Sequence, residues 1–223
     1  MMPISNDRIR KVKNLLRPSV YGVGFIGIGP YVAGKKNGKI KTYQVWSNML
    51  QRVYRPSNKN VARQYAGTWV HPDWHNYQYF AAWYEKQINE FNSVSFRWCI
   101  DKDLKIPGNR QYGTETCFVV PEQINALLND RFHARGKLPL GVSQTRNYYQ
   151  ARINNFGKPK TLGTYKTIRE AQLSYWSAKF QIIQQTTIVY WQYIPESLAF
   201  RLLCFDWEDA FAYYGDDARL WSD

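Results

Sequence analysis

The chain has 223 residues, a formal net charge of +13 at pH 7 and a hydrophobic fraction of 44%. This apolar content excludes a disordered chain, and the length suits one large domain or two to three small ones. No run approaches the roughly 20 apolar residues of a membrane span, and the N-terminus lacks the apolar core of a signal peptide. We therefore expect a cytoplasmic protein with no membrane partner.

The charge is distributed unevenly along the chain. Residues 1–60 hold twelve Lys and Arg against the single acid Asp7, and residues 134–180 hold nine against Glu170. From residue 181 onward the sign reverses, with seven acids against two arginines. Two basic blocks followed by an acidic tail suit a polyanion such as nucleic acid, because neutralised phosphates release condensed counterions. A solvated basic surface without a partner is the alternative.

The N-terminal part predicts a ribbon and short helices. Residues 1–16 are basic and indicate an arm or a short helix. Residues 20–46 alternate glycine with apolar residues, and Asn37-Gly38 supplies a hairpin turn, so we expect a β-ribbon. Apolar residues at helical spacing then predict two short helices. Their apolar positions are Val45, Trp46, Met49, Leu50 and Val53 in the first, and Phe80, Tyr84, Ile88 and Phe91 in the second.

The middle of the chain changes period. Residues 94–101 alternate as a strand does, residues 107–109 form a Pro-Gly-Asn loop, and residues 117–120 predict a second short strand. Pro121 suits the first turn of a helix. The apolar face of this helix holds Ile124, Leu127 and Leu128. The predicted order is strand, loop, strand and helix.

The next segment predicts a small sheet covered by a helix. Residues 138–144, 147–153 and 159–165 read as three short strands parted by turn residues. Thr167 and Glu170 have the spacing of a capping box, which marks the start of a helix. The predicted core face of this helix is Ala171, Tyr175, Ala178 and Ile182. Pro195 begins another amphipathic stretch, and the chain ends in an acidic, aromatic tail. The fold class is therefore α+β.

Two stretches resemble known DNA-acting modules. The string CIDKDLKIPGNRQYGTETCFVVPEQIN resembles the ββα-metal module of bacteriophage HNH endonucleases, and YQVWSNMLQRVY and WHNYQYFAAWYE look like the part that precedes it. The stretch LPLGVSQTRNYYQARINNFGKPKTLGTYKTIREAQLSYWSAK resembles the APETALA2-type DNA-binding module that often follows it. The resemblance runs from about Val20 to about Phe205.

This resemblance implies a domain organisation. It comprises a basic arm over residues 1–19, an HNH-like module with its N-terminal extension over 20–133, an APETALA2-type module over 134–185, and a C-terminal helical acidic tail over 186–223. The expected architecture is a small helical and β-ribbon N-terminal part, a ββα-metal module, and then a three-stranded antiparallel sheet plus a helix.

The resemblance also implies a nuclease site. HNH chemistry needs a divalent metal, Mg²⁺ or another hard cation, and a general base. Asp101 and Asp103 match metal ligands, Asn125 takes a second ligand position on the helix, and Asn109 matches an asparagine that braces the loop. Lys102 stands where the family has its catalytic histidine. Two flanking carboxylates favour the charged form of Lys102, so it suits a phosphate clamp better than a base. The alternatives are a solvated charged turn, an ordinary turn asparagine and a helix-surface amide.

The histidines and cysteines add little to this site. None of the histidines takes the strand position of the catalytic one. His71 and His75 would share a helix face, but Pro72 argues against that geometry, so we expect packing and hydrogen bonding rather than a metal pair. His133 follows the predicted ββα helix and could contact phosphate or complete a site. The three cysteines, Cys99, Cys117 and Cys204, are widely separated, which supports neither a disulfide framework nor a zinc site. Cys99 and Cys117 lie in apolar, strand-like stretches, so two buried thiols are expected.

The APETALA2-type resemblance places the sheet in the major groove of double-stranded DNA. Alternation puts Tyr148, Gln150 and Arg152 on one face of the second strand, and Tyr149, Ala151 and Ile153 on the face toward the helix. Long polar side chains are the predicted DNA contacts. They are Arg146, Arg152, Lys158 and Lys160 for phosphates and bases, and Gln144 and Gln150 as base readers.

Three functions follow as hypotheses. The first is an HNH-type endonuclease relative that binds DNA through its C-terminal module and nicks or cuts it near residues 101–125. The second is a DNA-binding or regulatory protein whose nuclease module has lost cleavage, which the lysine at position 102 favours. The third is a phage structural or host-interaction protein that contacts a protein partner through its acidic tail.

Overall fold

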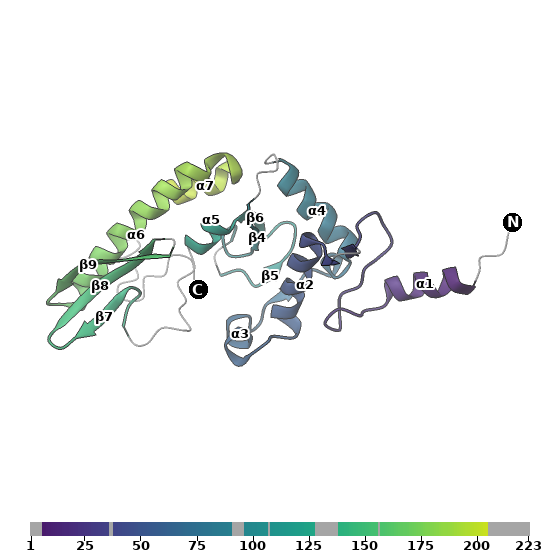
Figure 1. Cartoon of the computed structure of the whole chain (residues 1–223), viewed down its shortest axis with the longest axis horizontal. Coiled ribbons are helices and arrows are strands. Elements are labelled where there is room, and N and C mark those ends of the chain that lie inside the picture. Colours follow the sequence, from purple (N-terminus) through teal and green to yellow (C-terminus); the bar gives the residue numbers. More distant parts are fainter. Residues whose placement is uncertain are drawn as a thin grey trace. The chain divides into compact units, whose positions relative to one another are not determined.

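The computed structural model describes residues 6–35, 38–90, 96–106, 108–127, 138–155 and 157–204. Helices and small sheets alternate along the chain, which confirms the α+β class (Figure 1). The chain divides into two units. The first comprises Met1–Ser95 with Ile100–Val119, and the second comprises Phe96–Cys99 with Val120–Asp223.

Helices dominate the first unit. They are α1 (Asn6–Leu16), α2 (Lys41–Tyr54), α3 (Lys59–Gln64) and α4 (Tyr77–Glu90), with a 3-10 turn, η1 (Pro72–His75). The two helices predicted from apolar spacing are confirmed as α2 and α4, although Phe91 lies outside the described residues. Trp46 on α2 and Phe80 on α4 are fully buried, and the Trp46 indole donates to the Trp74 carbonyl over 2.7 Å. An aromatic core therefore holds this unit together.

The predicted β-ribbon of residues 20–46 is wrong for most of its described length. Strand pairing there is limited to the hairpin of β1 (Gly34–Lys35) with β2 (Gly38–Lys39) and to two isolated bridges. Gly22 and Gly27 have positive φ angles of 84° and 75°, so they turn the chain. A Cβ at Gly24 would come within 2.5 Å of the Leu50 side chain. The glycines therefore mark turns and close packing against α2 instead of an extended ribbon.

The middle segment has the predicted order of strand, loop, strand and helix. β4 (Trp98–Asp101) pairs with β6 (Phe118–Pro121), and α5 (Glu122–Leu127) follows directly. Pro121 ends β6 and does not begin the helix. Ile124 and Leu127 are buried as expected, and Leu128 lies outside the described residues.

The loop between β4 and β6 carries a strand that the sequence pattern does not reveal. This strand is β5 (Gln111–Tyr112), and it pairs in parallel with β3 (Trp69–Val70). The backbone amide of Trp69 donates to the Arg110 carbonyl over 2.8 Å, and that of His71 donates to the Tyr112 carbonyl over the same distance. The loop is thereby anchored to an upstream part of the first unit.

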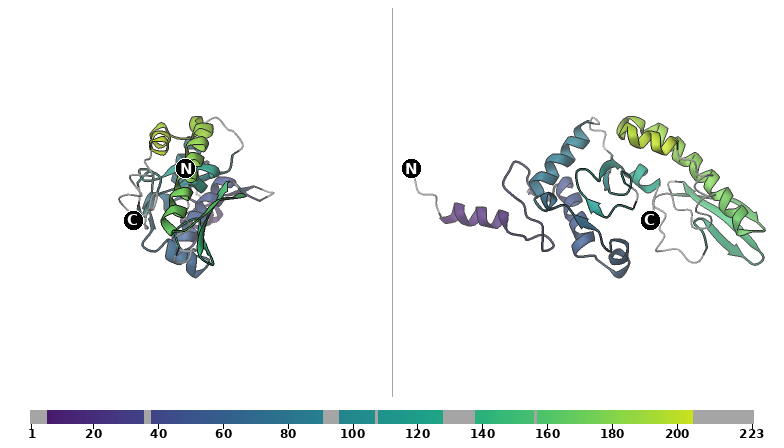
Figure 2. Two further views of the ribbon diagram at one scale, coloured as in Figure 1. Left: turned by 90° about the vertical axis from the view of Figure 1, so that its left-hand side faces the viewer. Right: turned by 180° about the vertical axis from the view of Figure 1, so that it is seen from behind.

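The predicted three-stranded sheet is present in the second unit. It is antiparallel, in the order β7 (Val142–Thr145), β8 (Tyr148–Asn155) and β9 (Lys158–Tyr165). The helix α6 (Ile168–Tyr190) runs along one face of this sheet in all three views (Figures 1 and 2). The sheet therefore has one face covered by a helix and one opposite face.

Local signals predicted where the helices that follow the sheet begin. The capping box is confirmed, because the Thr167 hydroxyl accepts from the Glu170 amide while the Glu170 carboxylate accepts from the Thr167 amide. α6 continues past residue 185, where the module was expected to end, to Tyr190. After η3 (Trp191–Tyr193), α7 (Glu196–Leu203) follows Pro195 as predicted. None of the helices in the described ranges is long and apolar enough to cross a membrane.

The core face of α6 is only partly the predicted one. Ala171 and Tyr175 are buried, whereas Ala178 and Ile182 are half-buried. Ile183 is buried in their place in the second half of the helix, at 1% exposure. In the second half of α6 the buried residues therefore lie on a slightly different side of the helix than the predicted spacing gives.

Candidate functional site

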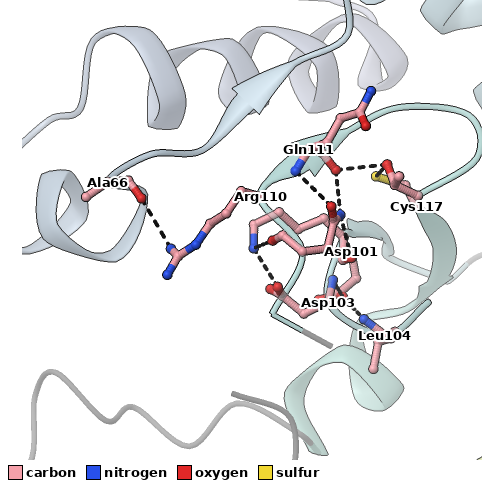
Figure 3. Close-up of polar contacts among 10 residues, drawn as sticks. Ala66, Asp101, Asp103, Leu104, Arg110, Gln111 and Cys117 are labelled. Atoms are coloured by element: carbon pink, nitrogen blue, oxygen red, sulfur yellow. Dashed lines mark hydrogen bonds and ion pairs between the residues drawn. The ribbon is translucent and has the colours of Figure 1, made fainter. Parts of the chain in front are cut away.

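Asp101 closes a tight turn at the end of β4. Its Oδ1 accepts the backbone amides of Asp103 over 2.8 Å and of Leu104 over 2.7 Å (Figure 3). Burial raises the pKa of the Asp101 carboxyl, and the two amide hydrogen bonds oppose that shift. One oxygen of the proposed metal ligand is thus engaged in a local turn of the kind that aspartate commonly forms.

The side chain of Lys102 points into the loop that begins at Asp101. Its Nζ lies 2.5 Å from Asp103 Oδ1 and 2.7 Å from the carbonyl oxygen of Asn109, and it donates to both. The residue is only 7% exposed, whereas the Asp103 side chain is 42% exposed. A buried ammonium needs such compensation, because an unpaired charge away from water is costly.

Asn109 joins the two ends of the same loop. Its Nδ2 donates to the carbonyls of Lys102 over 2.9 Å and Gln111 over 2.6 Å. Its Oδ1 accepts the Gln111 amide over 2.9 Å. Each polar atom of the Asn109 side chain is therefore used to hold backbone groups. We refer to residues 101–111, with Pro107 outside the described part, as the Lys102 loop.

Further contacts brace the exit from the Lys102 loop. The Thr116 hydroxyl donates to the Gln111 carbonyl over 2.9 Å, and Arg110 donates from Nη1 to the Ala66 carbonyl over 3.2 Å (Figure 3). Cys117 is buried, and burial raises the pKa of its thiol to about 12. This thiol is therefore protonated at neutral pH and is not a nucleophile, because nucleophilic attack needs the thiolate. No motif in the sequence indicates the role of Thr116 or the contact with Ala66.

The two histidines of the first unit have structural hydrogen bonds. His71 Nδ1 accepts the Asp73 amide over 3.3 Å at the start of η1. His75 Nε2 lies 3.0 Å from the Tyr54 hydroxyl, and burial lowers the pKa of His75. Trp74 between them is 1% exposed. These contacts agree with the expected packing and hydrogen bonding, while His133 lies outside the described residues.

The Lys102 loop is a poor fit for a divalent metal. Within the described ranges, no group of three or more His, Cys, Asp or Glu side chains could hold an ion. The Asp103 carboxylate and the Asn109 carbonyl, both oxygens suited to a hard cation, already contact the Lys102 ammonium. Two unit positive charges about 4 Å apart repel by about 4 kcal/mol at an effective dielectric constant of about 20, and a divalent ion doubles this. Asn125, half-buried on α5, belongs to the second unit.

The second feature that bears on function is the sheet face opposite α6. Residues directly across from each other on paired strands share a face. Ala151 and Ile153 are buried on the helix side, and the Tyr165 hydroxyl donates to Ser174 on α6 over 2.7 Å. The other positions form what we call the outer face. It consists of Ser143, Thr145, Tyr148, Gln150, Arg152, Asn154, Pro159, Thr161 and Thr164.

The predicted DNA contacts divide between the two faces. Gln150 and Arg152 lie on the outer face, and Arg146 is exposed in the turn between β7 and β8. In contrast, Gln144 is paired with Tyr149, which places it on the helix side. The lysines of β9 lie on the helix side as well. Lys160 is paired with Ile153 and Lys158 with Asn155.

All charged side chains of the sheet are basic. Residues 142–165 contain no Asp or Glu. The nearest acid along the chain is Glu170, whose carboxylate is bonded to Thr167 in the helix cap, and these bonds lower the pKa of Glu170. The outer face therefore offers amide, hydroxyl and guanidinium groups without a carboxylate of its own.

Comparisons with protein-family models, with curated proteins and with solved structures find nothing that matches this chain. The HNH-like and APETALA2-type assignments thus remain predictions from the motifs. The acidic tail expected to contact a protein partner lies outside the described residues from position 205 onward. The features on which a function can be argued are the Lys102 loop and the outer face.

Proposed function

We propose that this protein binds double-stranded DNA through the outer face of the β7–β9 sheet. One observation carries the proposal: β8 alternates between residues buried under α6 and the polar side chains Gln150 and Arg152, on a sheet free of carboxylates. A sheet held rigid by a helix can present such side chains to the major groove. Arg152 is exposed and is not part of the core of this unit.

The chemistry of the outer face suits contacts with both bases and phosphates. An arginine can donate two hydrogen bonds to guanine, and a glutamine can bond bidentately to adenine. Serine and threonine hydroxyls commonly contact phosphate oxygens in DNA complexes. Ser143 and Thr145 would supply such hydroxyls on the outer face. Arg146 and the lysines of the β8–β9 hairpin, Lys158 and Lys160, would add attraction to the phosphate backbone. Among the nine basic residues of positions 134–180, those of the sheet and its hairpin turns would supply the electrostatic part of binding.

For the segment from β4 to α5, we propose a scaffold role without DNA cleavage. The HNH resemblance implies metal-dependent nicking, which needs a free metal site and a general base. In the Lys102 loop, the residue at the position of that base is a lysine whose ammonium is bonded to Asp103 and Asn109. One carboxylate oxygen of Asp101 accepts hydrogen bonds from two backbone amides of the turn. These bonds favour the catalytically inactive DNA-binding protein over the nuclease.

Incubation with supercoiled plasmid tests both halves of the proposal. In the presence of Mg²⁺ or Mn²⁺, the wild type is expected to retard the plasmid on a gel without producing the nicked form. The double variant Gln150→Ala with Arg152→Ala should lose most of the retardation. Arg169→Ala is the matched control, because this arginine is exposed on α6 and not on the outer face. Nicking by the wild type that is lost in Asp101→Ala would overturn the scaffold role, and equal retardation by the double variant would overturn the binding face.

A further inference from the structure

The Lys102 ammonium has the surroundings of a bound cation. It lies between a carboxylate oxygen of Asp103 at 2.5 Å and the carbonyl oxygen of Asn109 at 2.7 Å, and Lys102 is 7% exposed. Carboxylate and carbonyl oxygens are the ligands that hard cations take in proteins. We infer that Lys102 is a built-in cation of this loop, which lets the loop fold without a divalent metal.

The Asn109 carbonyl is held in position by the side chain of its own residue. The Asn109 side chain bonds to the Lys102 carbonyl and to both backbone groups of Gln111. The carbonyl that accepts from the ammonium is therefore aimed by the side chain of its own residue. Because this acceptor is already held in place, little further ordering is needed for it to accept from the ammonium.

The Asp103 carboxylate is neutralised by the same contact. Its Oδ1 is paired with Lys102, while the neighbouring Asp101 Oδ1 bonds to two backbone amides. A covalently attached cation needs no metal from solution, so the loop should be equally stable with or without divalent ions. This inference rests on the geometry of the loop and does not depend on whether the chain binds DNA.

Thermal unfolding of the full-length protein tests the inference with two variants at one position. Lys102→Ala empties the cation position and leaves its oxygens in place. Lys102→Met removes the charge but fills the position with an apolar chain of similar length. Each protein is measured with EDTA and with millimolar Mn²⁺, and bound Mn²⁺ is followed directly by electron paramagnetic resonance.

The melting temperature of the wild type is expected to be the same with EDTA and with Mn²⁺, and no bound Mn²⁺ should be detected. Both variants should melt at a lower temperature than the wild type. Only Lys102→Ala should then gain several degrees with Mn²⁺ and show bound ion, because a ligand that binds the folded state alone stabilises it.

Two results would overturn the inference. One is a wild type that is stabilised by Mn²⁺ and loses this response in Asp103→Asn, because a metal would then share the loop with Lys102. The other is a Lys102→Ala variant that melts at the wild-type temperature, because the ammonium would then hold nothing together. The wild-type measurement stands even if Lys102→Ala does not fold.

Discussion

Lys102 and Asn109 bond to each other in both directions. The Lys102 ammonium donates to the Asn109 carbonyl over 2.7 Å, and the Asn109 amide donates to the Lys102 carbonyl over 2.9 Å. The pair closes the loop across seven positions of sequence using side chains that could otherwise face solvent. The polar residues that look like a catalytic site in the sequence are therefore engaged in holding the backbone of the loop.

We expect Asn109→Ala to destabilise the protein. The substitution removes the side-chain partner of the Lys102 carbonyl and of the Gln111 amide in a part-buried loop, while the Gln111 carbonyl keeps its bond from Thr116; the loss should cost about 2 to 3 kcal/mol. Asn109→Asp keeps the acceptor and loses both donated bonds, so its loss should also be measurable. Urea denaturation gives the free energy of unfolding, with Asn155→Ala, at an exposed position, as the control. An Asn109→Ala protein as stable as the wild type would show that the loop closes without it.

Arg146 occupies a strained backbone position in the turn between β7 and β8. Its φ of +44° lies in the left-handed region, which costs a residue other than glycine about 1 to 2 kcal/mol. Arg146→Gly should therefore stabilise the protein by about 1 kcal/mol while weakening DNA binding, because the charge is lost. Arg146→Ala should weaken DNA binding equally without the gain in stability. Denaturation and fluorescence anisotropy with a labelled duplex separate the two effects, and unchanged affinity in both variants would remove Arg146 from the interface.

Lys179 on α6 should make the free energy of unfolding depend on pH. Burial lowers the pKa of Lys179 from its ordinary value of 10.5 to about 8. Between about pH 8 and pH 10.5 the unfolded chain binds more protons than the folded one, so stability contributed by this residue rises with pH in that window. Lys179→Met should remove that rise and stabilise the protein at pH 7 by about 2 to 3 kcal/mol. The measurement is the difference in unfolding free energy between variant and wild type across this range. A difference that does not change with pH would contradict the prediction.

Two basic residues on opposite sides of the sheet should differ in their effect on DNA affinity. Arg152 lies on the outer face, whereas Lys160 is paired with Ile153 on the helix side. Arg152→Ala should weaken DNA binding by 1 to 3 kcal/mol, or about 5- to 150-fold, if it contacts a base. Lys160→Ala should have a smaller effect, equal for all sequences, because it would contribute only through phosphate attraction. Anisotropy titrations with two unrelated duplexes distinguish the two cases. A larger effect of Lys160→Ala would show that the opposite face is the one that binds.

Elements set by local signals could be predicted from the sequence. The capping box at Thr167 and Glu170, the apolar spacing of α2 and the alternation of β8 depend on residues close together in the chain. Each of these patterns has one structural solution that buries its apolar positions. The α+β class followed from them.

Features set by distant contacts could not be predicted in the same way. The parallel pairing of β5 with β3 joins residues about forty positions apart and uses two-residue strands with no alternation to read. The register shift between Ala151 and Arg152 reverses which residues of β9 share a face with Arg152, and so moves Lys160 to the helix side. The bonds of Lys102 within its loop also depend on the fold of the loop, because charged turn residues look the same whether they face solvent or the interior.

The measurement that tests the DNA-binding claim most directly is the affinity of the wild type for a short duplex over a range of salt concentrations. We expect the logarithm of the binding constant to fall linearly with the logarithm of salt concentration, by about 0.9 for each phosphate neutralised. The double variant Gln150→Ala with Arg152→Ala should bind more weakly and with a shallower slope, while Arg169→Ala should behave much more like the wild type. Affinity that is absent at low salt, or identical in wild type and double variant at every salt concentration, would contradict the account.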